Sequence, residues 1–169
     1  FEDDYNRFFK ADVPVNARRL KAYHLPLPLN QKPRFGVLSA KIPIAALKDK
    51  AREKGVNLTV YLTAVYLHAI QQIWENPELN RRKKKTGKLG IQIPVNLRNS
   101  YPSITMRNFS LFVMPEIDPG MGHYTFDEIV KTVFHQMQLE TDTRLINKII
   151  SRNVGSERKI IVHAIPLFI

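Results

Sequence analysis

The strongest hydrophobic pattern along the chain runs from Leu58 to Trp74, where apolar side chains recur at helical spacing. One stripe of this predicted helix consists of Leu58, Leu62, Val65, Tyr66, Ala69, Ile70 and Ile73. The opposite face carries Val60, Ala64 and Leu67. A helix that is apolar on two faces is usually buried on both, so we expect it to lie between a sheet and other helices, or between subdomains. Asn76-Pro77 predicts its end.

A strict alternation of apolar and polar residues follows from Lys88 to Arg98, which is the period of a strand with one buried face. The apolar side consists of Leu89, Ile91, Ile93, Val95 and Leu97. The other side consists of Gly90, Gln92, Pro94, Asn96 and Arg98. Pro94 has no N–H to donate, so the strand suits the edge of a sheet. A second strand is predicted at about Arg107 to Pro115.

Thr125-Phe126-Asp127-Glu128 has the form of a capping box, which predicts the start of another helix. Its apolar stripe consists of Phe126, Ile129, Val130, Val133, Phe134 and Met137. The stripe changes phase between Glu140 and Arg144 and resumes at Leu145, Ile146, Ile149 and Ile150. We therefore expect a kinked long helix or two helices, ending near Asn153 to Gly155. Ser156 would then cap a last helix.

The N-terminal third has weaker patterns. Residues 1–33 predict an extended lead-in, and Arg34 to Ile42 has the character of a strand. A short helix from Ile44 to about Lys54 follows, with Gly55 as its left-handed stop. Strands and helices thus alternate, which predicts an α/β domain with a mixed sheet covered by helices. We expect one domain over residues 1–169, with the α/β core in residues 34–169.

Composition supports a globular chain without a membrane span. The chain has 169 residues, of which 44% are hydrophobic and 24% charged, and it contains no cysteine. No apolar run approaches the roughly 20 residues that a spanning helix needs. The first residues lack the pattern of a signal peptide, so a reducing cytoplasm is expected. The missing initiator Met and the apolar last residues, 165–169, predict a piece cut from a longer protein.

Charge favours a polyanionic partner. The formal net charge is +11, which attracts nucleic acid, anionic lipid or the phosphates of coenzyme A without distinguishing them. The densest run is Arg81 to Lys85, with Lys88 close behind, and it is typical either of a solvated loop or of a polyanion contact. No RNA-recognition or helix-turn-helix signature accompanies this run, so nucleic acid is the less favoured partner.

Short motifs offer little catalytic chemistry. The histidines (His24, His68, His123, His135 and His163) are scattered, with no metal-ligand spacing, so no metal is predicted and His68 and His135 are expected at or near the surface. No nucleophile elbow, phosphate-binding glycine loop or dinucleotide fingerprint occurs. His123 and Asp127 have the spacing of an acyltransferase His-x-x-x-Asp motif. We reject this match because Gly122 replaces the first of its paired histidines and Glu128 its final glycine.

An ordered set of segments carries a family resemblance. The segments are Gly55-Val56-Asn57-Leu58-Thr59, Ile93-Pro94-Val95-Asn96-Leu97-Arg98, Met106-Arg107-Asn108-Phe109 and Thr125-Phe126-Asp127-Glu128. With the Lys21 to Leu25 lead-in, they resemble the later part of coenzyme A-dependent acyltransferases of the chloramphenicol acetyltransferase and condensation-domain superfamily, closest to alcohol acetyltransferase-like members. Each motif is short, but together they cover nearly the whole chain.

The resemblance implies one half of a two-subdomain architecture with a channel between the halves. In the family, a histidine of the first half removes the proton from an alcohol or amine as it attacks acyl-coenzyme A. This chain would supply scaffold and channel wall, with Asn96, Arg98, Asn108 and Ser110 orienting or bracing the site. The missing N-terminal half of the same protein would then be its partner, and acyl-coenzyme A its co-substrate.

Departures from the family pattern leave alternatives open. The motif His-His-x-x-x-Asp-Gly is absent, and so is the late Asp-Phe-Gly-Trp-Gly segment of many members. We therefore expect the chain alone to be inactive, and its exposed interface to allow self-association. A basic polyanion-binding module and a non-catalytic condensation-domain-like relative are the alternative readings. For Arg98 and Asn108 there is also an alternative to a role in the channel. Their side chains would then only form hydrogen bonds with backbone groups where the strands separate.

Overall fold

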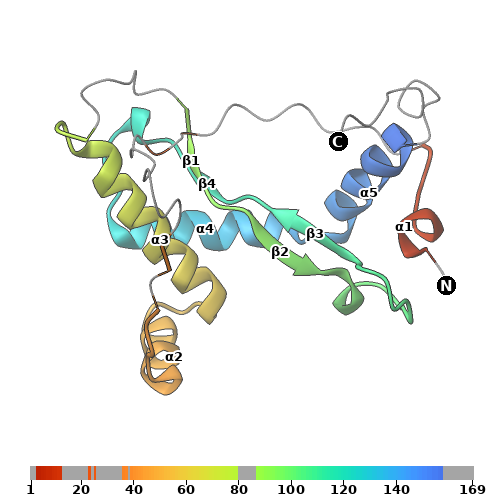
Figure 1. The fold of residues 1–169 in the computed structure, drawn as a ribbon, viewed down its shortest axis with the longest axis horizontal. Helices are drawn as coiled ribbons and strands as arrows, with labels where there is room; N and C mark the ends of the chain where they lie inside the picture. Colours follow the sequence, from red (N-terminus) through yellow and green to blue (C-terminus); the bar gives the residue numbers. More distant parts are fainter. Residues whose placement is uncertain are drawn as a thin grey trace. The chain divides into compact units, whose positions relative to one another are not determined.

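The computed structural model describes residues 3–12, 23, 25, 36–37, 39–79 and 87–157, and Figure 1 shows their arrangement along the chain. The described elements are α1 (Asp4–Arg7), α2 (Ile44–Glu53), α3 (Leu58–Glu75), β1 (Leu89–Gly90), β2 (Ile93–Asn96), the 3-10 turn η1 (Leu97–Asn99), β3 (Ser110–Val113), β4 (Glu116–Ile117), the 3-10 turn η2 (Pro119–Met121), α4 (Phe126–Glu140) and α5 (Thr143–Glu157).

Helices combine with small antiparallel ladders, so the predicted mixture of helix and strand is confirmed. In the described residues β1 pairs with β4 and β2 pairs with β3, each as a two-stranded ladder. The expected single mixed sheet is therefore not what these strands form. The predicted strand from Lys88 to Arg98 is divided into β1 and β2, with Ile91 and Gln92 between them. The predicted strand at about Arg107 to Pro115 contains β3, and β4 lies just beyond its end.

The elements group into two compact units. Within residues 87–157 the boundaries fall between Ile91 and Gln92, between Met114 and Pro115, and between Met137 and Gln138. One unit holds α1, β2, β3 and α5, and the other holds α2, α3, β1, β4 and most of α4. The chain therefore passes from one unit to the other within each predicted strand. The expected single domain remains a prediction.

The unit with α3 has a core built on one face of that helix. Its buried residues are Val60, Ala64, Leu67, Leu89, Ile117, Ile129, Val130 and Val133. Asn57 caps α3, because its side chain accepts a hydrogen bond of 2.9 Å from the Val60 N–H. Gly55 ends the α2 segment at a φ of +69°, a conformation that favours glycine, as predicted.

The second face of α3 corrects the expectation of a helix buried on both sides. Leu62 keeps 44% of its surface exposed, Val65 42% and Tyr66 51%. The face opposite them, with Leu67 at 0%, is the one that packs within the chain. A two-faced apolar pattern predicts that both faces are suited to burial, but it cannot say which face finds a partner in the same polypeptide.

The predicted capping box opens α4. The Glu128 N–H donates to Thr125 Oγ1 at 3.3 Å, and the Thr125 N–H donates to Glu128 Oε2 at 2.8 Å. This second hydrogen bond is the main cause that lowers the pKa of Glu128 below its ordinary value of 4.5. The change of phase after Glu140 is a real break, since α4 and α5 are separate helices.

The other unit has an aromatic core between β2, β3, α5 and α1. Its buried residues are Leu97, Tyr101, Phe109, Leu111, Ile146, Ile150 and Val154. Tyr5, Phe8 and Phe9 pack against this core, although the N-terminal segment was predicted to be an extended lead-in. In fact Asp3 caps the short helix α1 by accepting from the Tyr5 N–H. Aromatic burial, which has no sequence period over so few residues, explains the difference.

Two further predictions need correction. Residues 36–37 and 39–42, the described part of the predicted Arg34 to Ile42 strand, form no strand, and Val37 is 80% exposed. Helix α5 continues through Ser156 to Glu157, so Ser156 does not begin a new helix. The period-four spacing of the buried Ile146, Ile150 and Val154 explains this extension. Residues 158–169 lie outside the described part.

Candidate functional site

The four residues expected to face a channel lie together on the β2–β3 ladder. Asn96 and Ser110 are direct cross-strand partners in the register of the ladder. Ser110 Oγ donates to Asn108 Oδ1 at 2.8 Å, while Asn96 Oδ1 accepts from the Arg98 N–H at 3.1 Å and from its guanidinium at 3.4 Å. The structure therefore brings all four residues to one end of one ladder.

Their exposure follows the predicted alternation. Gln92, Pro94, Asn96 and Arg98 are exposed, whereas Leu97 is fully buried. Asn108 is also exposed, and Ser110 is half-buried. The polar face of the strand thus presents an amide, a guanidinium and a second amide outward, and the apolar face makes the core, as the sequence predicted.

Arg98 also has a bracing role. Its guanidinium donates to the backbone carbonyls of Thr105 at 3.0 Å and of Arg107, both in the loop between η1 and β3. Together with the bond to Asn96, these contacts use three of the five guanidinium N–H donors. Of the two readings of Arg98 that the sequence left open, the satisfaction of backbone groups is thus observed directly.

Tyr5 is part of this region and no sequence signal pointed to it. Its hydroxyl donates to the Ser110 carbonyl and accepts from the Ser110 N–H, the latter at 3.0 Å. The Tyr5 ring also meets the edge of Phe109 at a centroid distance of 5.1 Å. Burial raises the pKa of the Tyr5 phenol. The contact spans 105 positions, which local patterns do not report.

A groove lies along the outer face of α3 in the other unit. It has a volume of about 390 Å³ and is lined by Leu58, Thr59, Leu62, Thr63, Tyr66 and Ile91. This volume is in the range of about 300–1,000 Å³ typical of ligand pockets. Thr63 Oγ1 donates to the Thr59 carbonyl at 2.7 Å, so this hydroxyl is already bonded within the helix. The lining has no titratable group except Tyr66, so the groove offers apolar contact area.

His123 is held by α3 and takes no part in a pair with Asp127. Its Nδ1 lies 2.7 Å from Glu75 Oε1 and 3.1 Å from Gln71 Nε2. The buried Gln71 side chain bonds both backbone groups of Tyr124, at 2.8 and 3.3 Å, which fixes its Nε2 near the imidazole. His123 Nδ1 can serve only one of these two contacts at a time, since a carboxylate accepts a hydrogen bond and an amide N–H donates one.

Asp127 makes a different contact, an ion pair of 2.5 Å with Lys54. The two residues of the rejected His-x-x-x-Asp match therefore have separate partners, Glu75 on α3 and Lys54 directly after α2. This geometry agrees with rejecting them as a catalytic unit.

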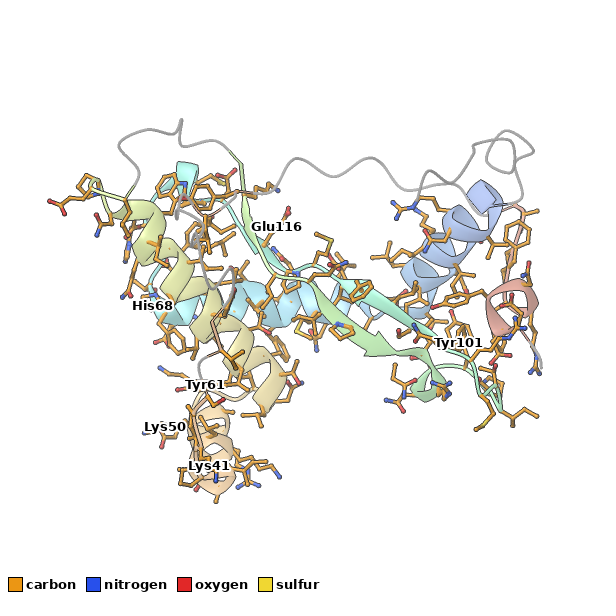
Figure 2. The ribbon with its side chains drawn as sticks, viewed as in Figure 1. Lys41, Lys50, Tyr61, His68, Tyr101 and Glu116 are labelled. Atoms are coloured by element: carbon orange, nitrogen blue, oxygen red, sulfur yellow. The ribbon has the colours of Figure 1, made fainter. Side chains whose placement is uncertain are left out.

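The remaining histidines are separate from one another. His68 lies on α3 (Figure 2). Its ring meets Phe126 edge-on with a centroid distance of 5.8 Å, and His135 is exposed on α4. His24, His163 and the run from Arg81 to Lys85 lie outside the described residues. Over the described ranges no cluster of three His, Asp or Glu residues is arranged to hold a metal ion.

Lys88 is the one described residue of the basic segment. It pairs with Glu116 across the β1–β4 ladder at 2.6 Å, and this hydrogen bond raises the pKa of Lys88. Figure 2 labels Glu116 on β4. Because Lys88 already has a carboxylate partner, this contact supports a structural role for it more than a role in binding a polyanion.

Comparison with known proteins adds nothing to these observations, since the chain matches no protein-family model, no curated protein and no solved structure. Among the described helices none has the length and apolar character needed to cross a bilayer.

Proposed function

We propose that this chain is the scaffold and channel-wall portion of a coenzyme A-dependent acyltransferase, which moves an acyl group to an alcohol or amine. The observation that carries the proposal is the uncovered apolar face of α3. Leu62, Val65 and Tyr66 share this face, and each keeps more than two-fifths of its surface exposed. Contiguous exposed apolar area on a protein usually marks a contact surface.

The proposed partner for this face is the histidine-bearing half of the same protein. The ordered segments of the sequence resemble the later half of such acyltransferases, in which two similar halves meet along a channel. An α3 that is apolar on both faces suits this arrangement, because one face packs inward and the other can pack on the first half. Apolar association of this kind is driven by the area removed from water.

The chemistry assigned to each part follows from the reaction. An alcohol or amine must lose its proton as it attacks the thioester carbonyl, and a neutral imidazole on the other half would accept that proton. Bonded donors near the carbonyl oxygen would stabilise the negative charge that develops there. Asn96, Arg98, Asn108 and Ser110 are the proposed wall residues on this side. Acyl-coenzyme A is the proposed co-substrate, and the net charge of +11 is compatible with its phosphates.

Release of free coenzyme A from acetyl-coenzyme A in the presence of an alcohol tests this proposal. We expect no release above a heat-killed control by the chain alone, and release when the parent segment that bears His-His-x-x-x-Asp-Gly is added. The matched control is the same segment with its second histidine replaced by alanine, which should bind equally and restore nothing. Transfer by the isolated chain, or a bound but inactive pair, would refute the proposal.

A further inference from the structure

The loop between η1 and β3 presents the two most exposed large apolar side chains among the described residues. Ile104 is 87% exposed and Met106 is 84% exposed, although single exposed apolar residues elsewhere on proteins are ordinary. Here two such residues flank the buried Thr105 at the end of the β2–β3 ladder. Their exposure shows that both side chains point away from the core.

The loop is held in this conformation by the residues between and beside them. Tyr101 and Thr105 are buried, at 8% and 6% exposure, and the Tyr101 hydroxyl donates to Asn147 Oδ1 at 2.7 Å. The Ser103 hydroxyl donates to Asp4. Figure 2 labels Tyr101 where this loop begins. The outward direction of Ile104 and Met106 therefore results from an anchored backbone.

Backbone groups of Thr105 and Arg107, beside the tip residues, have hydrogen-bond partners close by. Arg98 donates to the carbonyls of Thr105 and Arg107. The Arg107 N–H donates to Thr105 Oγ1 at 3.2 Å, and the Thr105 N–H donates to Ser103 Oγ at 3.4 Å. An unpaired backbone group resists transfer to an apolar phase, because it loses hydrogen bonds to water. These hydrogen bonds lower that barrier for Thr105 and Arg107.

Positive charge lies beside the apolar tip. The Arg107 side chain is 59% exposed, and its guanidinium lies 4.0 Å from the Asp3 carboxylate. The whole chain carries a net charge of +11. Arginines near an anionic bilayer surface add attraction that complements the insertion of apolar side chains.

We propose that this tip docks on an anionic phospholipid surface, with Ile104 and Met106 among the lipid headgroups and Arg107 at their phosphates. The two apolar side chains, the bonded backbone groups of Thr105 and Arg107, and the exposed Arg107 guanidinium together fit that surface. The proposal concerns attachment to one face of a bilayer, and it does not depend on the proposed acyl transfer.

Co-sedimentation with vesicles tests this proposal. The probes are vesicles of phosphatidylcholine alone and of phosphatidylcholine mixed with phosphatidylserine. We expect the chain to bind the mixed vesicles only, and the variant I104S/M106S to bind them at least about tenfold more weakly, given the apolar area lost. The matched control is V37S/M121S, which removes two side chains of similar exposure, 80% and 81%, outside the tip.

Comparing I104S/M106S with V37S/M121S distinguishes binding through the tip from general attraction of a basic protein to anionic vesicles. Equal binding by I104S/M106S and the unaltered chain, or an equal loss in V37S/M121S, would overturn the proposal. Because the chain has no cysteine, I104C can also carry an environment-sensitive fluorophore as a second measurement. A blue shift on mixed vesicles is expected. A shift only on adding the histidine-bearing half would assign the tip to a protein contact and refute docking on lipid.

Discussion

Substituting alanine for one leucine on each face of α3 tests which face is buried in the isolated chain. Leu67 is fully buried, while Leu62 is 44% exposed on the opposite side of the same helix. Leu67→Ala removes a core side chain and leaves a cavity, which typically lowers the free energy of unfolding by about 2–5 kcal/mol. Leu62→Ala removes a side chain that already contacts water, so we expect a loss below about 1 kcal/mol. Both changes are Leu to Ala, so helix propensity affects them alike.

Thermal and urea unfolding, followed by circular dichroism, measure the difference. For a chain of this size, a loss of about 3 kcal/mol lowers the melting temperature by roughly 6–12 °C. We expect such a shift for Leu67→Ala, and about a third of it or less for Leu62→Ala. Equal losses for the two variants would mean that the outer face of α3 is already covered in the isolated chain. The reasoning about an open partner surface would then be wrong.

Other predictions concern the loop brace and the α4 cap. Arg98→Met removes two bonds to backbone carbonyls and should lower the free energy of unfolding by about 1–2 kcal/mol in urea titration, a loss that Arg98→Lys restores only in part. Thr125→Ala should cost about 1 kcal/mol by the same assay, and no loss would show that the cap contributes nothing. The pKa of Glu128 is lowered chiefly by the Thr125 N–H bond, so its stabilising effect is present above the ordinary value of 4.5 and is lost as the pH falls through the lowered value. Glu128→Gln should therefore flatten the decline in stability with acid, and an unchanged profile would contradict this assignment.

Local patterns predicted much of the secondary structure because their causes are local. The Thr125 cap, the stripe of α4 and the alternation around Asn96 depend on neighbours within a few positions, and each is confirmed. The pairing of Asn96 with Ser110 was not predicted, because a long loop between two strands does not fix their register.

Contacts between residues far apart in the sequence could not be predicted from local patterns. Tyr5 bonds to Ser110 across 105 positions, and the few aromatic residues near it have no period to reveal that contact. The prediction that the outer face of α3 is buried was wrong for a related reason. An apolar stripe indicates that a helix face is suited to burial, but it does not indicate which segment covers that face. The sequence could not distinguish a channel role of Arg98 from a structural one, because the loop whose carbonyls it binds has no sequence signature.

The central claim, that the outer face of α3 packs on the histidine-bearing half, is tested most directly by thiol labelling of L62C. The chain has no native cysteine, so the introduced thiol is the sole target for a maleimide. M121C, on a residue that is 81% exposed, serves as the matched control. The account predicts rapid labelling of L62C in the chain alone and strong protection once the other half is bound, with M121C labelled rapidly in both states. Unchanged labelling of L62C in a bound, active pair would contradict it.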